Sequence, residues 1–231
     1  MKAIAIITAR GGSKRIPGKN KKLFCGKPIL VYSIEAALQA GCFDIVMVST
    51  DDEKIADIAR EYGAEVPFFR SAENSDDFST TRDVVAEVLK QYAKQGMTFE
   101  YACCIYPTAP FITAKRLAES MELLQKKQAD SVLPVVPFSF PPQRCVVLED
   151  GRAVFKWPEH MLTRSQDLEP FYHDCGQYYC LNVKSFEEQN LLFMKNTYPV
   201  ILDELEVQDI DNETDWKLAE LKYKLLKENA K

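Results

Sequence analysis

The sequence lacks the cysteine and histidine patterns of disulfide-stabilised and zinc-binding proteins. It has seven cysteines, an odd number, and none of them form a CxxC pair, so the spacing supports neither a disulfide framework nor a zinc site. The two histidines, His160 and His173, are too isolated to be proposed as metal ligands. Cys103 and Cys104 lie in an apolar run and are expected in a core. This usage predicts a protein of the reducing cytoplasm.

Long apolar segments and repeats are also missing. No apolar run approaches the length of a membrane span. The apolar start is too short for a signal peptide and has no cleavage site. We therefore expect a cytoplasmic protein with no membrane partner. A chain of 231 residues, 46% of them hydrophobic, is sufficient for one domain, 1–231, with an ordinary core.

Acidic residues are absent from positions 1–34, which hold eight lysines and arginines. The remaining positions hold 21 basic and 34 acidic residues. A chain that is acidic overall, with a net charge of −5 and one basic segment, suits a small anionic ligand. Nucleic acid usually requires a broad basic face, so we expect no nucleic-acid partner.

Strand and helix patterns alternate along the first 136 residues. This alternation predicts an α/β fold with a mostly parallel sheet and helices on both faces. In such sheets ligands bind beyond the carboxyl ends of the strands, where Arg10, Asp51, Arg70 and Tyr106 fall. The expected strands are 3–7, 44–49, 65–69, 101–106 and 130–136, and the expected helices are 29–38, 53–62, 82–95 and 113–127. The helix from 53 is expected to be capped by Thr50 or Asp51, and the helix to 127 by Thr113.

The alternation breaks after Pro137. Residues 138–176 are rich in proline and aromatic residues, and Asp150-Gly151 predicts a hairpin between 144–148 and 153–157. We expect an inserted β-rich arm that serves as a lid or a dimer contact. Regular structure is predicted again at 177–183, near Val200 and in a last helix over 212–228. The apolar face expected for this helix consists of Trp216, Leu218, Leu221 and Leu225.

The stretch from Ala9 to Asn20, ARGGSKRIPGKN, follows the first strand and carries Arg10, Lys14, Arg15 and Lys19. Two adjacent glycines, Gly11 and Gly12, allow backbone N–H groups to turn inward, which predicts a polyphosphate cradle. It is not a P-loop, because five residues separate Gly12 from Gly18-Lys19 and Asn20 replaces the hydroxyl residue. Adjacent glycines also exclude the G-x-G-x-x-G fingerprint. A basic loop without function is disfavoured, since four cations in ten residues repel each other.

A second constellation, Asp209-Ile210-Asp211, precedes the last helix. In extended backbone its two carboxylates lie on one side, and hard oxygen donors at this spacing suit Mg²⁺. In the alternative interpretation Asp211 or Asn212 only caps the helix, which explains one acid and not two. The magnesium prediction depends on the fold bringing this pair opposite the cationic loop.

Taken in order, the motifs resemble those of CMP-nonulosonate synthetases, cytidylyltransferases that activate sialic acid and its bacterial relatives. The resemblance covers nearly the whole chain, is closest to the pseudaminic acid branch and implies a Rossmann-like nucleotidyltransferase fold. It rests on residues 9–20, 48–51 (VSTD), 70–73 (RSAE), 106–110 (YPTAP) and 209–211 (DID). Stretches distinctive of the branch are 75–78 (SDDF), 106–111 (YPTAPF), 137–141 (PFSFP) and 163–170 (TRSQDLEP).

The resemblance implies that the anomeric hydroxyl of a nine-carbon keto-acid sugar attacks the α-phosphate of CTP. The implied catalytic residues are Arg10, Lys14, Lys19 and Asp211, and Asp209 and Asp211 are the implied Mg²⁺ ligands. Arg10, Ser13, Lys14 and Lys19 are implied to hold the triphosphate, with Gly11 and Gly12 in the same nucleotide-binding loop. Contacts with cytosine or ribose are implied for Asn20, Arg70 and Thr81.

The implied sugar-binding residues are Tyr106, Arg164 and Gln166. Tyr106 stands where sialic acid synthetases usually have glutamine, which disfavours N-acetylneuraminate; strand-end packing of Tyr106 is an equal alternative. For Arg164 the alternatives are pairing with the sugar carboxylate and a solvated loop arginine. The family commonly forms homodimers through the arm. Synthetases for N-acetylneuraminate, legionaminate or Kdo remain open, as do a non-catalytic nucleotide-binding regulator and a glycosyltransferase.

Overall fold

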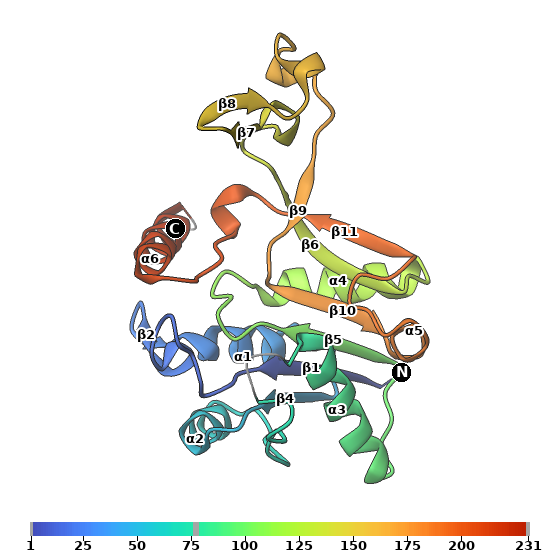
Figure 1. Ribbon diagram of the computed structural model, residues 1–231. Helices are drawn as coiled ribbons and strands as arrows, with labels where there is room; N and C mark the ends of the chain where they lie inside the picture. Colours follow the sequence, from blue (N-terminus) through green and yellow to red (C-terminus); the bar gives the residue numbers. More distant parts are fainter. Residues whose placement is uncertain (1, 76–78, 230–231) are drawn as a thin grey trace.

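The computed structural model describes residues 2–75 and 79–229 and shows a central sheet with helices on both faces (Figure 1). The distinctive stretch 75–78 therefore falls outside the described residues except for Ser75. In spatial order the sheet contains β11 (Thr197–Ile201), β6 (Ser131–Pro137), β10 (Tyr178–Asn182), β5 (Tyr101–Ile105), β1 (Ala3–Thr8) and β4 (Ile45–Ser49), with β9 (Tyr172–Asp174) paired to β6. Strands β9 and β10 run against the others. The predicted α/β fold is confirmed. The sheet, which was expected to be mostly parallel, is mixed because β9 and β10 pair antiparallel with their neighbours.

Strand β1 lies inside the sheet because its side chains are apolar on both faces. Ala5 and Ile7 pack on the side covered by three helices, and Ile4 and Ile6 pack on the side covered by two. This double burial matches the continuous apolar run that a central parallel strand requires. The first group is α1 (Ile29–Ala40), α2 (Glu53–Glu61) and α4 (Ala114–Lys126), and the second is α3 (Thr81–Lys94) and α5 (Val183–Gln189).

Helices α2 and α4 begin at polar caps. Thr113 caps α4 as predicted, accepting from the Arg116 N–H. Helix α2 is capped by Asp52, which accepts from the Ile55 N–H, so the prediction of Thr50 or Asp51 is wrong. Asp51 instead reaches toward the cationic loop.

The strand predicted at 65–69 is not formed. Only Glu65 makes a bridge, with Met47 of β4. Pro67 has no N–H and cannot continue the ladder. Arg70 nevertheless returns to the sheet, since its N–H donates to the Thr50 carbonyl at 2.8 Å.

The last helix, α6 (Glu213–Asn229), buries a different face from the one predicted. Trp216 and Ala219 are buried, with Tyr223 and Leu226 packed beside them. The other three residues of the predicted face are exposed: Leu218, Leu221 and Leu225. The helix carries two apolar stripes, and contacts with β2 (Leu23–Phe24) and α1 select the Trp216 stripe.

Residues 138–176 leave the end of β6, extend away from the sheet and return through β9 (Figure 1). The predicted hairpin is present as β7 (Val146–Glu149) and β8 (Arg152–Phe155), and Asp150 and Gly151 at its turn both have positive φ. The remaining short elements are β3 (Lys27–Pro28), η1 (Lys19–Lys21), η2 (Pro142–Arg144), η3 (Pro158–His160), η4 (Ser165–Asp167) and η5 (Glu204–Glu206).

All seven cysteines carry free thiols. Within residues 2–75 and 79–229, no helix combines the length and the apolar character needed to cross a bilayer.

Candidate active site

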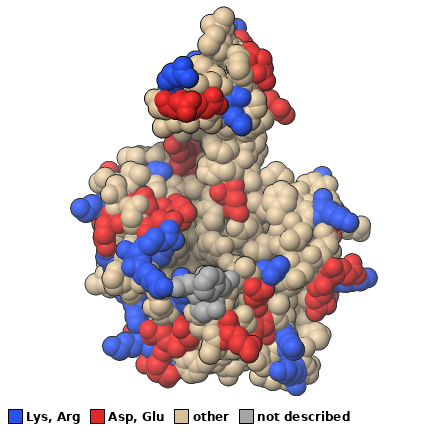
Figure 2. Space-filling view, in the orientation of Figure 1, with Lys and Arg blue, Asp and Glu red and all other residues tan. Residues whose placement is uncertain are grey.

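A cavity of about 610 Å³ opens at the carboxyl ends of β1 and β5. Basic side chains from the loop after β1 line it, and two carboxylates from the segment before α6 face them. These residues are Arg10, Lys14, Arg15, Lys19, Asp209 and Asp211. Figure 2 shows basic side chains gathered beside a hollow in the body of the molecule, with acidic side chains close by. The cationic loop and the acidic pair therefore belong to one site.

Shared hydrophobic packing brings these two distant segments together. Ile16 of the cationic loop and Ile210, between the two aspartates, are both buried in one cluster with Phe24 and Trp216. Because Ile210 points into the cluster, its two neighbours lie on the opposite side of the extended backbone. The cluster thus fixes the acidic pair against the loop.

Polar contacts continue this junction at the cavity surface. The Lys19 ammonium donates to the Ile210 carbonyl at 2.7 Å. Arg15 Nη1 lies 2.5 Å from Asp211 Oδ2. The condition set by the sequence, that the acidic pair lie opposite the cationic loop, is met.

Burial and mutual charge alter the ionisation of this junction. Desolvation lowers the pKa of Lys19, and the nearby charge of Asp211 partly offsets this. Desolvation raises the pKa of Asp209, and the negative charge of Asp211 raises it further. A cation bound between the two carboxylates would offset this repulsion between their negative charges.

The donor set fits a divalent cation that binds together with its substrate. No group of three or more His, Cys, Asp or Glu ligands is found in the part of the chain that the structure describes. A cation at Asp209 and Asp211 therefore needs further oxygen ligands from phosphate and water. Mg²⁺ is commonly held in this way, by one or two carboxylates and substrate phosphates.

Gly11 allows the loop to approach the start of α2 closely. The Gly11 N–H donates to Asp51 Oδ1 at 2.8 Å. A Cβ on Gly11 would lie 2.9 Å from both Cβ and Oδ2 of Asp52, whereas one on Gly12 would meet nothing within 4 Å. The predicted phosphate contact of Gly11 stays a prediction, since its N–H is used by Asp51 here.

Asn20 and Arg70 are both buried polar residues at the cavity. The Asn20 amide donates to the Arg10 carbonyl at 2.8 Å and so holds the loop. Arg70 donates through Nε to Ser49 Oγ and through Nη2 to the Ser49 carbonyl, at 3.1 and 2.6 Å. Desolvation lowers the pKa of Arg70, and Asp51 opposes this shift. A fixed, partly desolvated guanidinium is suited to binding a polar ligand.

Thr81 and Tyr106 form another wall of the cavity, and their hydroxyl groups lie 3.1 Å apart. Tyr106 is thus a lining residue and also packs against the ring of Tyr179. Both of its alternative interpretations, strand-end packing and ligand contact, are compatible with this position.

The arm residues are not brought to this cavity within the chain. Arg164 is exposed and pairs with Asp167 Oδ2 at 2.7 Å. Gln166 lines a separate groove on the arm, of about 470 Å³, between Phe138 and Phe171. Their contact with the sugar stays a prediction.

Several lining residues were not predicted from the sequence. Thr108 follows the end of β5 and could have been found from the rule on strand ends. Asn74 and Ser79 gave no such signal. Glu87 of α3 holds the segment at Asn74, because it accepts from the Ser71 N–H and the Asn74 amide.

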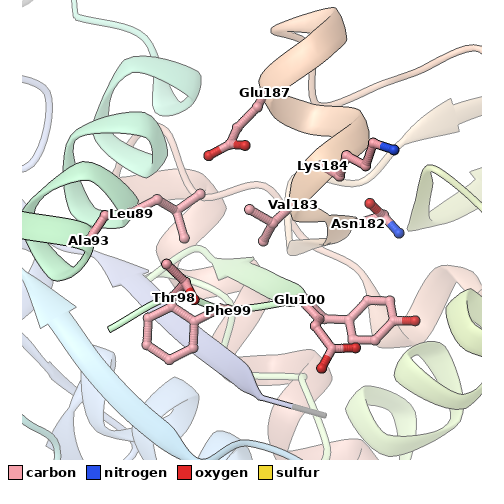
Figure 3. A pocket seen from close by; sticks show the side chains of 10 residues that line it. Leu89, Ala93, Thr98, Phe99, Glu100, Asn182, Val183, Lys184 and Glu187 are labelled. Atoms are coloured by element: carbon pink, nitrogen blue, oxygen red, sulfur yellow. The ribbon is translucent and has the colours of Figure 1, made fainter. Parts of the chain in front are cut away.

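A second cavity, of about 360 Å³, lies near the start of β5, between α3 and α5 (Figure 3). Leu89, Phe99 and Val183 contribute apolar surface to it, and Glu100 and Glu187 give it acidic groups. Lys184 is its single basic residue among those described. This charge is unsuited to a triphosphate, so the cavity at the cationic loop is the candidate active site.

A family model described as cytidylyltransferase matches residues 4–214. The chain belongs to the cytidylyltransferase family. It is 38% identical over 231 residues, all of both chains, to a pseudaminic acid cytidylyltransferase from Campylobacter jejuni subsp. jejuni serotype O:2. It is 35% identical over 227 residues, 95% of each chain, to a CMP-N,N'-diacetyllegionaminic acid synthase from Legionella pneumophila. The family prediction is confirmed.

The fold of this cytidylyltransferase matches a solved structure of CMP:2-keto-3-deoxy-manno-octonic acid synthetase complexed with CTP. The TM-score is 0.68 at 19% identity, covering 99% of this chain and 100% of that one. At this identity the likeness concerns the fold, and it confirms the predicted nucleotidyltransferase architecture.

Proposed function

We propose that this cytidylyltransferase transfers CMP from CTP to the anomeric hydroxyl of a nonulosonic acid, with pseudaminic acid as its substrate. The junction of the cationic loop and the acidic pair in one cavity carries this proposal. The full-length similarity to the Campylobacter jejuni enzyme supports pseudaminic acid. Legionaminic acid is the alternative supported by the Legionella pneumophila relative, and N-acetylneuraminate and Kdo are further candidates for the assay.

In this proposal the loop binds and aligns the triphosphate. Arg10, Lys14 and Lys19 lie along one side of the cavity and neutralise the phosphate oxygens. Ser13 and the Gly12 N–H add hydrogen bonds, while Gly11 lets the loop lie close to Asp52. The sugar oxygen forms a bond to the α-phosphorus as the bond to pyrophosphate breaks. Alignment and charge neutralisation supply most of the rate enhancement of such a transfer.

Asp209 and Asp211 would hold Mg²⁺, which supplies charge neutralisation and lowers the pKa of a coordinated hydroxyl. Lys19 holds the backbone between them through the Ile210 carbonyl and so keeps both carboxylates facing the loop. No separate general base is assigned. Asn20, Arg70 and Thr81 also line the cavity, where they would contact cytosine or ribose.

Tyr106 would contact the sugar. We propose that this protein is a cytoplasmic homodimer in which each arm, 138–176, reaches the partner subunit. Arg164 of such an arm could leave Asp167 for the sugar carboxylate, and Gln166 lies beside it. The exposed aromatic residues of the arm support a contact role: Phe138, Phe140, Trp157, Phe171 and Tyr172.

The test is release of pyrophosphate from CTP and Mg²⁺ with a panel of nonulosonic acids. We expect release with pseudaminic acid. Release only with another acid would overturn the sugar assignment, and CTP binding without any release would favour the non-catalytic regulator. Asp211→Ala is expected to abolish turnover while the melting temperature stays within a few degrees. Unchanged kcat in this variant would remove Asp211 from the metal site.

A further inference from the structure

Arg15 lines the active-site cavity but takes no part in the proposed transfer. Its guanidinium Nη1 lies 2.5 Å from Asp211 Oδ2. Lys19, the next basic residue of the loop, instead donates to the backbone carbonyl of Ile210. In the ligand-free protein Arg15 therefore pairs with a carboxylate that the proposed function gives to a metal ion.

The carboxylate of Asp211 is not used to begin helix α6. Asn212 Oδ1 accepts from the N–H groups of Thr214 and Asp215, at 2.8 and 3.0 Å, and so caps the helix. Asp215 Oδ2 in return accepts from the Asp211 N–H at 2.9 Å. These bonds hold the backbone of Asp211, and its side chain pairs with Arg15 at the cavity.

Arg15 can leave Asp211 without disturbing the loop that carries it. Its side chain is 68% exposed, whereas the next residue, Ile16, is buried in the cluster that contains Ile210. Lys19 adds a second anchor through the Ile210 carbonyl at 2.7 Å. Exposed ion pairs are weak, so a divalent cation can displace the guanidinium.

A metal ion at the acidic pair would compete with Arg15 for the same carboxylate. We propose that Arg15 is a placeholder for this ion, which neutralises Asp211 in the empty site and leaves it when Mg²⁺ binds. A metal ion that arrives alone must break the ion pair for two carboxylates. CTP adds phosphate oxygens as further metal ligands, and these also accept the released guanidinium. Arg15 thereby favours loading of the metal together with the nucleotide.

This inference rests on the proposed function, since it takes Asp209 and Asp211 as the metal ligands. Its test is binding of Mn²⁺ to the nucleotide-free protein, measured from the electron paramagnetic resonance signal of the free ion. Arg15→Gln removes the charge and keeps most of the stem, so that Mn²⁺ no longer has to break the ion pair. We expect the Kd for Mn²⁺ to fall about two- to fivefold, a small factor because the pair is exposed.

Lys22→Gln is the matched control. It removes a positive charge from the same region, one that pairs with Glu213 Oε1 at 2.7 Å and not with the acidic pair. Because salt screens distant charges, this variant should change the Kd for Mn²⁺ by less than about 1.5-fold at physiological ionic strength. Arg15→Lys keeps the charge and should bind Mn²⁺ as the wild type does. An equal or weaker affinity of Arg15→Gln, or the same gain in Lys22→Gln, would overturn the placeholder role.

Added salt gives a second readout. Salt weakens an exposed ion pair, so the ratio of the wild-type Kd to the Arg15→Gln Kd should approach one between about 0.05 and 0.5 M KCl. A ratio that stays constant would indicate a structural effect and overturn the proposal, as would an absence of Mn²⁺ binding in both proteins. If the wild type releases no pyrophosphate while Arg15→Gln binds Mn²⁺ more tightly, the proposed function fails and the placeholder role stands. If pyrophosphate is released and the two affinities are equal, the reverse holds.

Discussion

Replacement of Gly11 by alanine should destabilise this protein because the cationic loop lies against the start of α2. The added Cβ would stand 2.9 Å from both Cβ and Oδ2 of Asp52. The carboxylate oxygen can rotate away, but the Asp52 Cβ is attached to the backbone and cannot. Either the loop or the first turn of α2 must therefore move.

The size of the effect follows from what Asp52 does. It caps α2 through the Ile55 N–H at 3.0 Å and pairs with Lys21 at 2.6 Å. Loss of a cap costs about 1 kcal/mol, a partly exposed ion pair contributes up to about 1 kcal/mol, and overpacking of this kind costs about 1–3 kcal/mol. We expect Gly11→Ala to lower the free energy of unfolding by about 1–3 kcal/mol, which lowers the melting temperature by about 2–12 °C.

Gly12→Ala is the matched control, since its Cβ would meet nothing within 4 Å. It should change the free energy of unfolding by no more than about 0.5 kcal/mol. Both variants are compared by thermal unfolding and by urea titration without ligand. Equal stability of Gly11→Ala and wild type would refute the close approach of loop and helix.

Three further predictions concern the core, the sheet edge and the cavity. Ile210 is fully buried, and Ile210→Ala should lower the free energy of unfolding, measured by urea titration, by about 2–5 kcal/mol. Leu221 is exposed, and Leu221→Ala should lower it by less than about 0.5 kcal/mol. Hydrogen bonds to the Asp130 carboxylate, first of all the one from Gln189, lower its pKa in the folded protein. The ionised carboxylate therefore stabilises the fold at pH values above about 3.9, the pKa of an aspartate in the unfolded chain. Asp130→Asn should therefore destabilise most at neutral pH, and the difference should shrink as pH falls below about 4; a constant difference would contradict this. Arg70→Lys loses the two-pronged contact with the sheet end and should raise the KM for CTP about tenfold. An unchanged KM for CTP would exclude Arg70 from the nucleotide site.

Patterns within short segments could be predicted from the sequence. The apolar run of β1, the Thr113 cap of α4 and the Asp150-Gly151 turn each depend on neighbouring residues, and all three are present. The loop motif at Arg10 and the acidic pair at Asp209 could be recognised separately.

Features that depend on distant contacts could not be predicted. Both stripes of α6 are apolar, and contacts of Trp216 and Tyr223 with Phe24 decide which one is buried. The rings of Tyr106 and Tyr179 pack together because the register of β10 on β5 places Tyr179 opposite Cys104, two residues from Tyr106. No sequence spacing reports such a register.

The cluster that joins Ile16 to Ile210 also has a consequence for the order in which the protein becomes functional during synthesis. Trp216 and Ala219, which complete this cluster, belong to the last helix of the chain. Since chains emerge from the ribosome amino end first, the loop at Ala9–Asn20 is made well before its acidic counterpart at Asp209 and Asp211. Nascent chains that stop before α6 thus contain the loop and the acidic pair but lack the Trp216 and Ala219 packing that completes the cluster joining them.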